Sequence, residues 1–146
     1  MPRANGGLLL RAVVDTNVFV SAFLHPGRPL FQIVRLAAER RYRLLISPAI
    51  VRELGRVLEE EFDIEERVKI RRLKTLTRAA EIITPSITLD VIKEDPPDNR
   101  ILECAVEGKA DLIVSGNRHL LRLKSYQSIP IVRPIDFLRT LGVSTK

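Results

Sequence analysis

Three acidic residues occupy positions where a chain of alternating strands and helices would bring their side chains together. Asp15 follows a short apolar run, Glu53 lies one turn inside an expected helix, and Asp98 stands at the head of another. Asn117 follows a later apolar run, where a fourth acid would complete the set. Carboxylate and amide oxygens are the ligands that hard divalent cations prefer. This pattern predicts a metal site made by Asp15, Glu53, Asp98 and Asn117.

Each of these residues also has a simpler structural explanation. Asp15 fits a turn residue that bonds its own backbone, and Glu53 borders an apolar stripe where it could be solvated. Asp98 fits the third position of a capping box that Asp95 begins, and Asn117 is a good N-cap. Asp98, however, shares a helix face with apolar residues, and a buried carboxylate needs either a cation or a capping role.

Hydrophobic spacing and turn residues predict an alternation of strands and helices. Ser47 followed by Pro48 is a strong helix start, and Gly108 is an expected helix end. The predicted strands are residues 10–14, 43–46, 112–114 and 129–132, with short extended pieces at 82–83 and 91–92. The predicted helices are residues 29–40, one beginning at Ser47-Pro48, 64–80, one opened by residues 95–98 and running to 107, 118–123, and 135–141.

Short apolar strands separated by helices indicate a parallel sheet that is covered on both faces. The predicted fold class is therefore α/β, a three-layer α/β/α sandwich with a central parallel sheet. Sites in such folds form beyond the carboxyl ends of the strands. Asp15 and Asn117 are expected at that edge, whereas Asp111 precedes its strand and is expected at the opposite edge.

Length and composition favour one domain over residues 1–146, with flexible ends at 1–9 and 142–146. Hydrophobic residues make up 45% and charged residues 29% of the chain, which argues against a disordered or fibrous protein. No apolar segment is typical of a secretory signal or a membrane span, so a cytoplasmic protein is expected. Cys104 is the only cysteine, which excludes an internal disulfide and the usual cysteine zinc site.

The positive charge of the chain points to a polyanionic partner. The net charge is +6 with a pI near 10.0, and nucleic acid is the commonest partner for such proteins. The alternative is that the basic residues form the solvated face of an amphipathic helix. The candidate RNA contacts are Arg40, Arg41, Arg71, Arg72 and Arg118.

Four segments together resemble the PIN-domain family of nucleases. They are VVDTNVFVSA at 13–22, SPAIVREL at 47–54, DPPDNRIL at 95–102 and ADLIVSGNRHLL at 110–121. Their order and spacing make the resemblance specific, and it extends over nearly the whole chain from residue 11 to 141. It is strongest toward the branch described as VapC-type toxins of toxin–antitoxin pairs.

This resemblance implies a function, a cofactor and partners. The function is Mg²⁺- or Mn²⁺-dependent cleavage of single-stranded RNA, and the partners are a small antitoxin and a second copy of the chain in a homodimer. By position, Asp15, Glu53 and Asp98 match the metal-binding acids of the family. Asn117 replaces an aspartate that many members carry, and this is the main departure.

Three small polar residues, Thr16, Asn17 and Ser115, match positions near the acids, where they could orient carboxylates or water. Two other functions stay open, the first because residue 117 is neutral and the second because it also uses acids at strand ends. One is a PIN-fold nucleic-acid-binding protein with weak or lost catalysis. The other is a receiver-like phosphoacceptor, which would require an acidic pair directly after the first strand, where this chain has Asp15-Thr16-Asn17.

Overall fold

The structure, a computed structural model, describes residues 9–144, so the expected flexibility of residues 1–8 and 145–146 lies outside the described part. The elements in chain order are β1 (Arg11–Val14), α1 (Thr16–Leu24), α2 (Phe31–Ala38), β2 (Arg43–Ile46), α3 (Pro48–Glu60), α4 (Glu66–Ala79), β3 (Ala80–Ile82), α5 (Asp98–Glu107), β4 (Leu112–Val114), α6 (Arg118–Leu123), β5 (Ser125–Tyr126), β6 (Ile129–Val132) and α7 (Pro134–Thr140). No helix in this part is long and apolar enough to cross a membrane.

The strands form one sheet with the order β3-β2-β1-β4-β6-β5. Strands β1, β2, β3, β4 and β6 are parallel, as predicted, but β5 runs antiparallel to β6 and corrects the expectation of a wholly parallel sheet. A tight connection between β5 and β6 makes this hairpin, and two-residue strands are too short to show a hydrophobic period. The chain order reverses between β1 and β4, and this reversal marks the place where ligands bind in such sheets.

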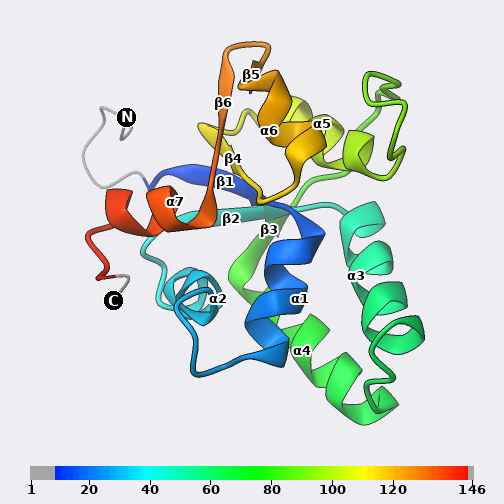
Figure 1. Cartoon of the computed structure of the whole chain (residues 1–146), viewed down its shortest axis with the longest axis vertical. Helices are drawn as coiled ribbons and strands as arrows, with labels where there is room; N and C mark the ends of the chain where they lie inside the picture. The colour runs from blue at the N-terminus through cyan, green and yellow to red at the C-terminus, as the bar shows by residue number, and fades with distance from the viewer. Residues whose placement is uncertain (1–8, 145–146) are drawn as a thin grey trace.

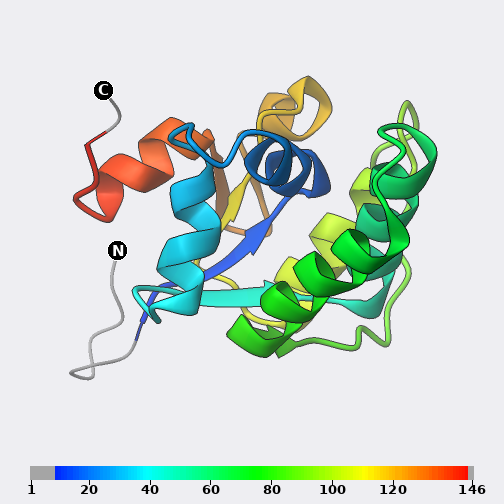
Figure 2. The same ribbon diagram turned by 90° about the horizontal axis from the view of Figure 1, so that it is seen from below.

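Helices cover both faces of the sheet, which confirms the predicted α/β sandwich (Figures 1 and 2). Helices α5 and α6 lie on one face, and α1, α2, α4 and α7 lie on the other. This division follows from right-handed crossovers, because the chain moves outward from β1 to β3 and then returns to build β4 and β6. Helix α3 packs against both α1 and α5.

The strand interiors are buried on both faces, as short apolar strands require. Val13 and Ile113 pair across β1 and β4, and both have exposed fractions of 0%. Ser47 caps α3 as predicted, because its Oγ accepts the Ile50 N–H at 3.2 Å and Pro48 follows it. This cap fixes where α3 begins and therefore where Glu53 lies.

Two local predictions differ from the structure. The sequence pattern predicted no helix at residues 16–24, yet α1 occupies them. Val18, Phe19 and Val20 are all buried, and only Asn17 and Ser21 make a narrow polar stripe, so α1 lacks the wide polar face that makes an amphipathic helix visible. Residues 91–92 form no strand; instead their two N–H groups donate to the side-chain oxygen of Asn99 at 2.9 Å.

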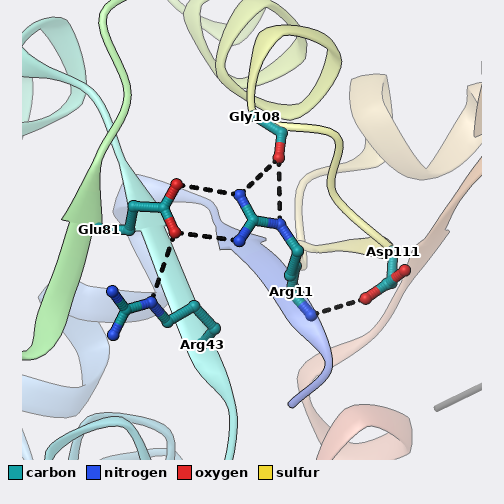
Figure 3. Close-up of polar contacts among 5 residues, drawn as sticks. All are labelled: Arg11, Arg43, Glu81, Gly108 and Asp111. Atoms are coloured by element: carbon teal, nitrogen blue, oxygen red, sulfur yellow. Dashed lines mark hydrogen bonds and ion pairs between the residues drawn. The ribbon is translucent and has the colours of Figure 1, made fainter. Parts of the chain in front are cut away.

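A charged network joins the strands at the amino end of the sheet (Figure 3). Arg11 donates to both carboxylate oxygens of Glu81, at 2.9 and 3.1 Å, and to the carbonyl of Gly108 at 2.8 and 3.2 Å. Arg43 lies 3.4 Å from the same carboxylate. Asp111 accepts the Arg11 backbone N–H at 2.8 Å, as expected for a residue at the edge opposite Asp15.

Candidate active site

An acidic pocket of about 260 Å³ opens at the carboxyl end of β1, between the first turn of α1, the part of α3 from Glu53 onward and the head of α5. Its lining contains five carboxylates and one arginine among the described residues. The lining residues are Asp15, Thr16, Asn17, Glu53, Arg56, Val57, Glu61, Asp95, Pro97, Asp98 and Ile101. The fold thus brings Asp15, Glu53 and Asp98 to one pocket from three separate parts of the chain. We call it the acid pocket below.

Asp15 is held at the floor of the acid pocket by the neighbouring strand. Its backbone N–H donates to the Val114 carbonyl at 2.9 Å, and its Oδ2 accepts the Ser115 hydroxyl at 2.7 Å. Burial raises the pKa of Asp15, and the hydrogen bond from Ser115 opposes that rise. Hydrogen bonds from the backbone N–H groups of Asn17 and Thr16 also lower the pKa of Asp15, so this carboxylate makes the local backbone contacts of a turn residue in addition to its bond from Ser115. Ser115 holds the carboxylate in place, in the orienting role that the resemblance implied.

Asp98 is buried with one carboxylate oxygen unused. Its exposed fraction is 5%, and Oδ2 has no hydrogen-bond partner among the described residues. Burial raises the pKa of Asp98 to about 7, and the nearby Asp15 and Asp95 carboxylates add to the rise. Helix α5 begins at Asp98 with Pro97 as its N-cap residue, so the capping box begun by Asp95 is wrong. The buried charge therefore lacks the compensation that a cap would have supplied.

Asn99, which follows Asp98, anchors the irregular segment that leads into α5. Its side-chain nitrogen donates to the carbonyls of Ile92 and Pro96, at 2.8 and 3.0 Å, while its oxygen accepts the two N–H groups named above. These bonds use all four hydrogen-bonding positions of the amide. Asn99 therefore fixes the head of α5, and with it Asp98. No feature of the sequence alone distinguished it from an ordinary helix asparagine.

Glu53 lies at the rim of the acid pocket, where it is paired with Arg56, a residue that no sequence pattern singled out. Its side chain is 23% exposed, and its Oε1 lies 2.6 Å from Arg56 Nε. Arg56 also contacts Glu60 and Glu61, at 2.8 and 3.6 Å. The separation of three residues along α3 was the available signal, because such pairs meet on one helix face. Arg56 is the one cation in the described lining of the pocket.

Asn117 caps α6, which is the simpler of its two expected roles, and its side chain also faces Asp98. Its Oδ1 accepts the His119 N–H at 2.7 Å and caps α6, while its Nδ2 lies 3.5 Å from Asp98 Oδ1. The cap requires the oxygen to face His119, so the nitrogen must face the acid. An amide nitrogen is not a cation ligand. In this orientation Asn117 donates toward Asp98 and uses its oxygen for the cap, and its part in binding a metal stays a prediction.

The remaining predicted residues divide between the site and distant surfaces. Thr16 and Asn17 line the acid pocket, and Arg118 directly follows Asn117. The other four arginines are not gathered there. Arg40 and Arg41 follow α2 and precede β2, at the amino end of the sheet, and Arg71 and Arg72 lie on α4. Arg72 stacks over the Phe23 ring at 5.6 Å, which gives it a packing role.

The donor set of the acid pocket fits a hard divalent cation in ligand type and charge. Within residues 9–144, no three Asp, Glu, His or Cys side chains are already close enough to hold one ion. Mg²⁺, however, keeps several waters and needs only one or two carboxylates from the protein. The unused oxygen of Asp98, beside Asp15, supplies such a ligand. Glu53 uses Oε1 for its ion pair with Arg56, so this pairing competes with a cation for that oxygen.

The fold and the site define an α/β protein with an acidic pocket at the reversal of its strand order. The PIN domain family model matches residues 11–119. The chain therefore belongs to the PIN-domain family. It is 30% identical over 120 residues to the uncharacterized protein MJ1680 of Methanocaldococcus jannaschii, a match that covers 79% of this chain and 76% of that protein.

Three solved structures share the fold. PAE2754 from Pyrobaculum aerophilum has a TM-score of 0.63 at 16% identity, covering 91% of this chain and 90% of its own. VapBC2 from Rickettsia felis, bound to a promoter DNA fragment, has a TM-score of 0.62 at 16% identity, covering 85% and 98%. VapBC-1 from nontypeable Haemophilus influenzae has a TM-score of 0.59 at 14% identity, covering 86% and 99%.

Proposed function

We propose that this PIN-domain protein is an endoribonuclease that cleaves single-stranded RNA with Mg²⁺ or Mn²⁺. The observation that supports it most is the unused, buried oxygen of Asp98 in a pocket of acids. A protein that gained nothing from this group would be more stable with a neutral residue there. A buried ionisable group that is present although it lowers the stability of the fold is typical of functional sites.

In this proposal, each acid has a distinct task. Asp15 and Asp98 hold the cation, and Ser115 keeps the Asp15 carboxylate oriented. Glu53 joins when Arg56 moves away, which leaves the guanidinium beside the pocket and free to contact an RNA phosphate. Asn117 holds Asp98 through its amide nitrogen. When bound, the cation would lower the pKa of an attacking water and offset charge on the scissile phosphate.

We further propose that the chain is the toxin of a toxin–antitoxin pair, with a small antitoxin as partner and a homodimer as its assembly. This proposal is supported by the VapC-type sequence motifs and by the fold shared with two VapBC assemblies. The net charge of +6 is consistent with an RNA substrate, although the acid pocket itself is negative. RNA phosphates would therefore reach the pocket only together with a cation.

A second candidate is a PIN-fold nucleic-acid-binding protein with weak or lost catalysis. It is favoured by the neutral Asn117 and by the absence, within residues 9–144, of a preassembled group of three metal ligands. This protein would bind RNA and leave it intact.

One experiment separates the two candidates. The chain, purified without a partner, is incubated with end-labelled single-stranded RNA under single-turnover conditions, with Mg²⁺, Mn²⁺ or EDTA. The nuclease proposal expects cleavage with either metal, none with EDTA, and almost none for Asp15→Asn or Asp98→Asn. Binding without cleavage by the unmodified chain would favour the second candidate. Cleavage at the parent rate by both variants would remove the acids from the site.

A further inference from the structure

A second hollow lies beside the acid pocket. It has a volume of about 250 Å³ and is bounded by α1, the residue before α2, the β4–α6 connection and the first residue of α7. Its lining residues are Asn17, Val18, Ser21, Leu30, Gly116, Asn117 and Pro134. Asn17 lines both hollows, and Asn117 lies 3.5 Å from Asp98. A ligand in one hollow would therefore be the immediate neighbour of a ligand in the other.

The second hollow differs from the acid pocket in charge. No acidic or basic side chain is part of its described lining, whereas five carboxylates line the acid pocket. A phosphate or a cation would find no compensating charge there. Val18, Leu30 and Pro134 supply apolar surface instead. The hollow suits a neutral, flat group that is attached to a charged one.

The polar groups of this hollow retain hydrogen-bonding capacity. Among the described residues, the side chains of Asn17 and Ser21 form no hydrogen bond. Between them they offer amide and hydroxyl groups that can donate and accept. Gly116 also lines the hollow, and the space beside it is open, because a Cβ there would meet no atom within 4 Å. An apolar surface with a few uncommitted polar groups is the usual make-up of a small-molecule site.

We infer that the second hollow binds the base of the nucleotide next to the scissile phosphate, and that Ser21 and Asn17 read the edge of that base. The inference rests on the proposed nuclease function. Bases of single-stranded RNA are free to turn out of the stack and enter such pockets, and their edges carry the donors and acceptors that polar side chains recognise. The cation and phosphate occupy one hollow and the neutral base occupies the other.

Position-specific removal of a base tests this assignment. Binding of a short fluorescent single-stranded RNA is measured by anisotropy in an Asp15→Asn background, which keeps the RNA intact. The same oligonucleotide is then made with one abasic nucleotide at each position in turn. We expect one position at which loss of the base weakens binding about tenfold, the order found for single base contacts.

A side chain that fills the second hollow should make RNA binding insensitive to loss of the base at the sensitive position. Ser21→Leu occupies the hollow from α1, and Gly116→Val occupies it from the other wall if the first variant folds poorly. Both should weaken binding of intact RNA and show no further loss at the sensitive position, as a double-mutant cycle requires. Ser125→Leu, the same change on β5 outside both linings, is the matched control and should behave like the parent.

The outcomes are distinct. An even response to abasic sites, or a sensitive position that persists in the filled variants, overturns the base assignment. Loss of affinity with 2′-deoxy substitution alone assigns the hollow to ribose and also overturns it. If the unmodified chain cleaves RNA in either case, only this inference falls. If the unmodified chain neither binds nor cleaves RNA, the proposed function itself falls.

Discussion

At the amino end of the sheet, Glu81 is bonded by Arg11 and Arg43, whereas at the carboxyl end Asp98 keeps an oxygen without a partner in the described structure. The pKa of Glu81 is lowered, chiefly by its hydrogen bonds from Arg11. The pKa of Asp98 is raised to about 7, chiefly by burial. Both residues are acids at the ends of one sheet.

The two ends of the sheet differ in how their charged groups are paired. The amino end satisfies its charges internally and ties β1 to β3 and to the end of α5 (Figure 3). Gly108 is part of this packing, because a Cβ there would lie 2.8 Å from the Cys104 carbonyl. The carboxyl end leaves the Asp98 carboxylate under-compensated, which is the charge that the proposed cation would offset.

The largest expected effect comes from exchanging each acid for its amide. Asp98→Asn should lower single-turnover RNA cleavage by more than about a hundredfold, beyond the loss typical of residues that only orient a ligand. Glu81→Gln should leave cleavage per folded molecule unchanged. Equal losses in the two variants would show that the two ends of the sheet are not functionally distinct.

The free energy of unfolding should fall in Glu81→Gln and rise in Asp98→Asn, so stability and cleavage respond in opposite directions. Glu81→Gln should lower the free energy of unfolding by on the order of 1–2 kcal/mol, because charge-assisted hydrogen bonds are lost from a partly exposed site. Asp98→Asn should raise it at pH 8 without metal, because a buried charge is removed. Urea denaturation of both variants measures these changes, and a destabilised Asp98→Asn would contradict the comparison.

The contributions of Asp98 and Glu81 to the free energy of unfolding should depend on pH with opposite signs. Asp98 binds its proton more tightly when folded, so its ionisation removes stability as pH rises from about 3.8 to about 7. Glu81 has a lowered folded pKa, so its contribution is present above about 4.5 and is lost as pH falls through the folded value. Metal-free melting curves should show the first slope vanish in Asp98→Asn and the second vanish in Glu81→Gln.

Asn117→Asp is expected to have a smaller effect, on the melting temperature and on Mn²⁺ affinity. The aspartate keeps an oxygen for the α6 cap but replaces the N–H that faces Asp98 with a like charge. Without metal the melting temperature should fall, and Mn²⁺ should restore more stability than it does in the parent. Calorimetric Mn²⁺ titration gives the affinities. Equal affinity in both proteins would place residue 117 outside the metal site.

The smallest expected effect is that of Arg56→Gln. This change removes the pairing partner of Glu53 and the one positive charge in the described lining of the acid pocket. Mn²⁺ affinity should rise by a small factor, because exposed ion pairs are weak, while RNA affinity should fall. Arg52→Gln, one helix residue before Glu53 and outside that lining, is the control. An unchanged Mn²⁺ affinity would show that Arg56 does not compete for Glu53.

The sequence predicted the strands from their short apolar runs and singled out Asp15 and Asp98 because each lies at the end of a hydrophobic pattern, whereas Glu53 was singled out by the joint pattern that resembles the PIN-domain family. Asp15 ends a buried strand and Asp98 begins a buried stripe, and both signals are local. The sequence could not predict contacts between distant positions. Arg11 and Glu81 are 70 positions apart, and the Asn99 bonds to the irregular segment depend on its folded path. Helix α1 was missed because burial on nearly all sides removes its periodicity.

The central claim, that the acids of the carboxyl end hold a divalent cation, is tested most directly by Mn²⁺ binding to the purified chain. Free Mn²⁺ is followed by electron paramagnetic resonance at pH 8 for the parent, Glu81→Gln and Asp98→Asn. The parent and Glu81→Gln should bind Mn²⁺ with equal affinity, and Asp98→Asn should lose most of it. Equal binding by all three proteins, or none by the parent even with uncleaved RNA present, would contradict the assignment.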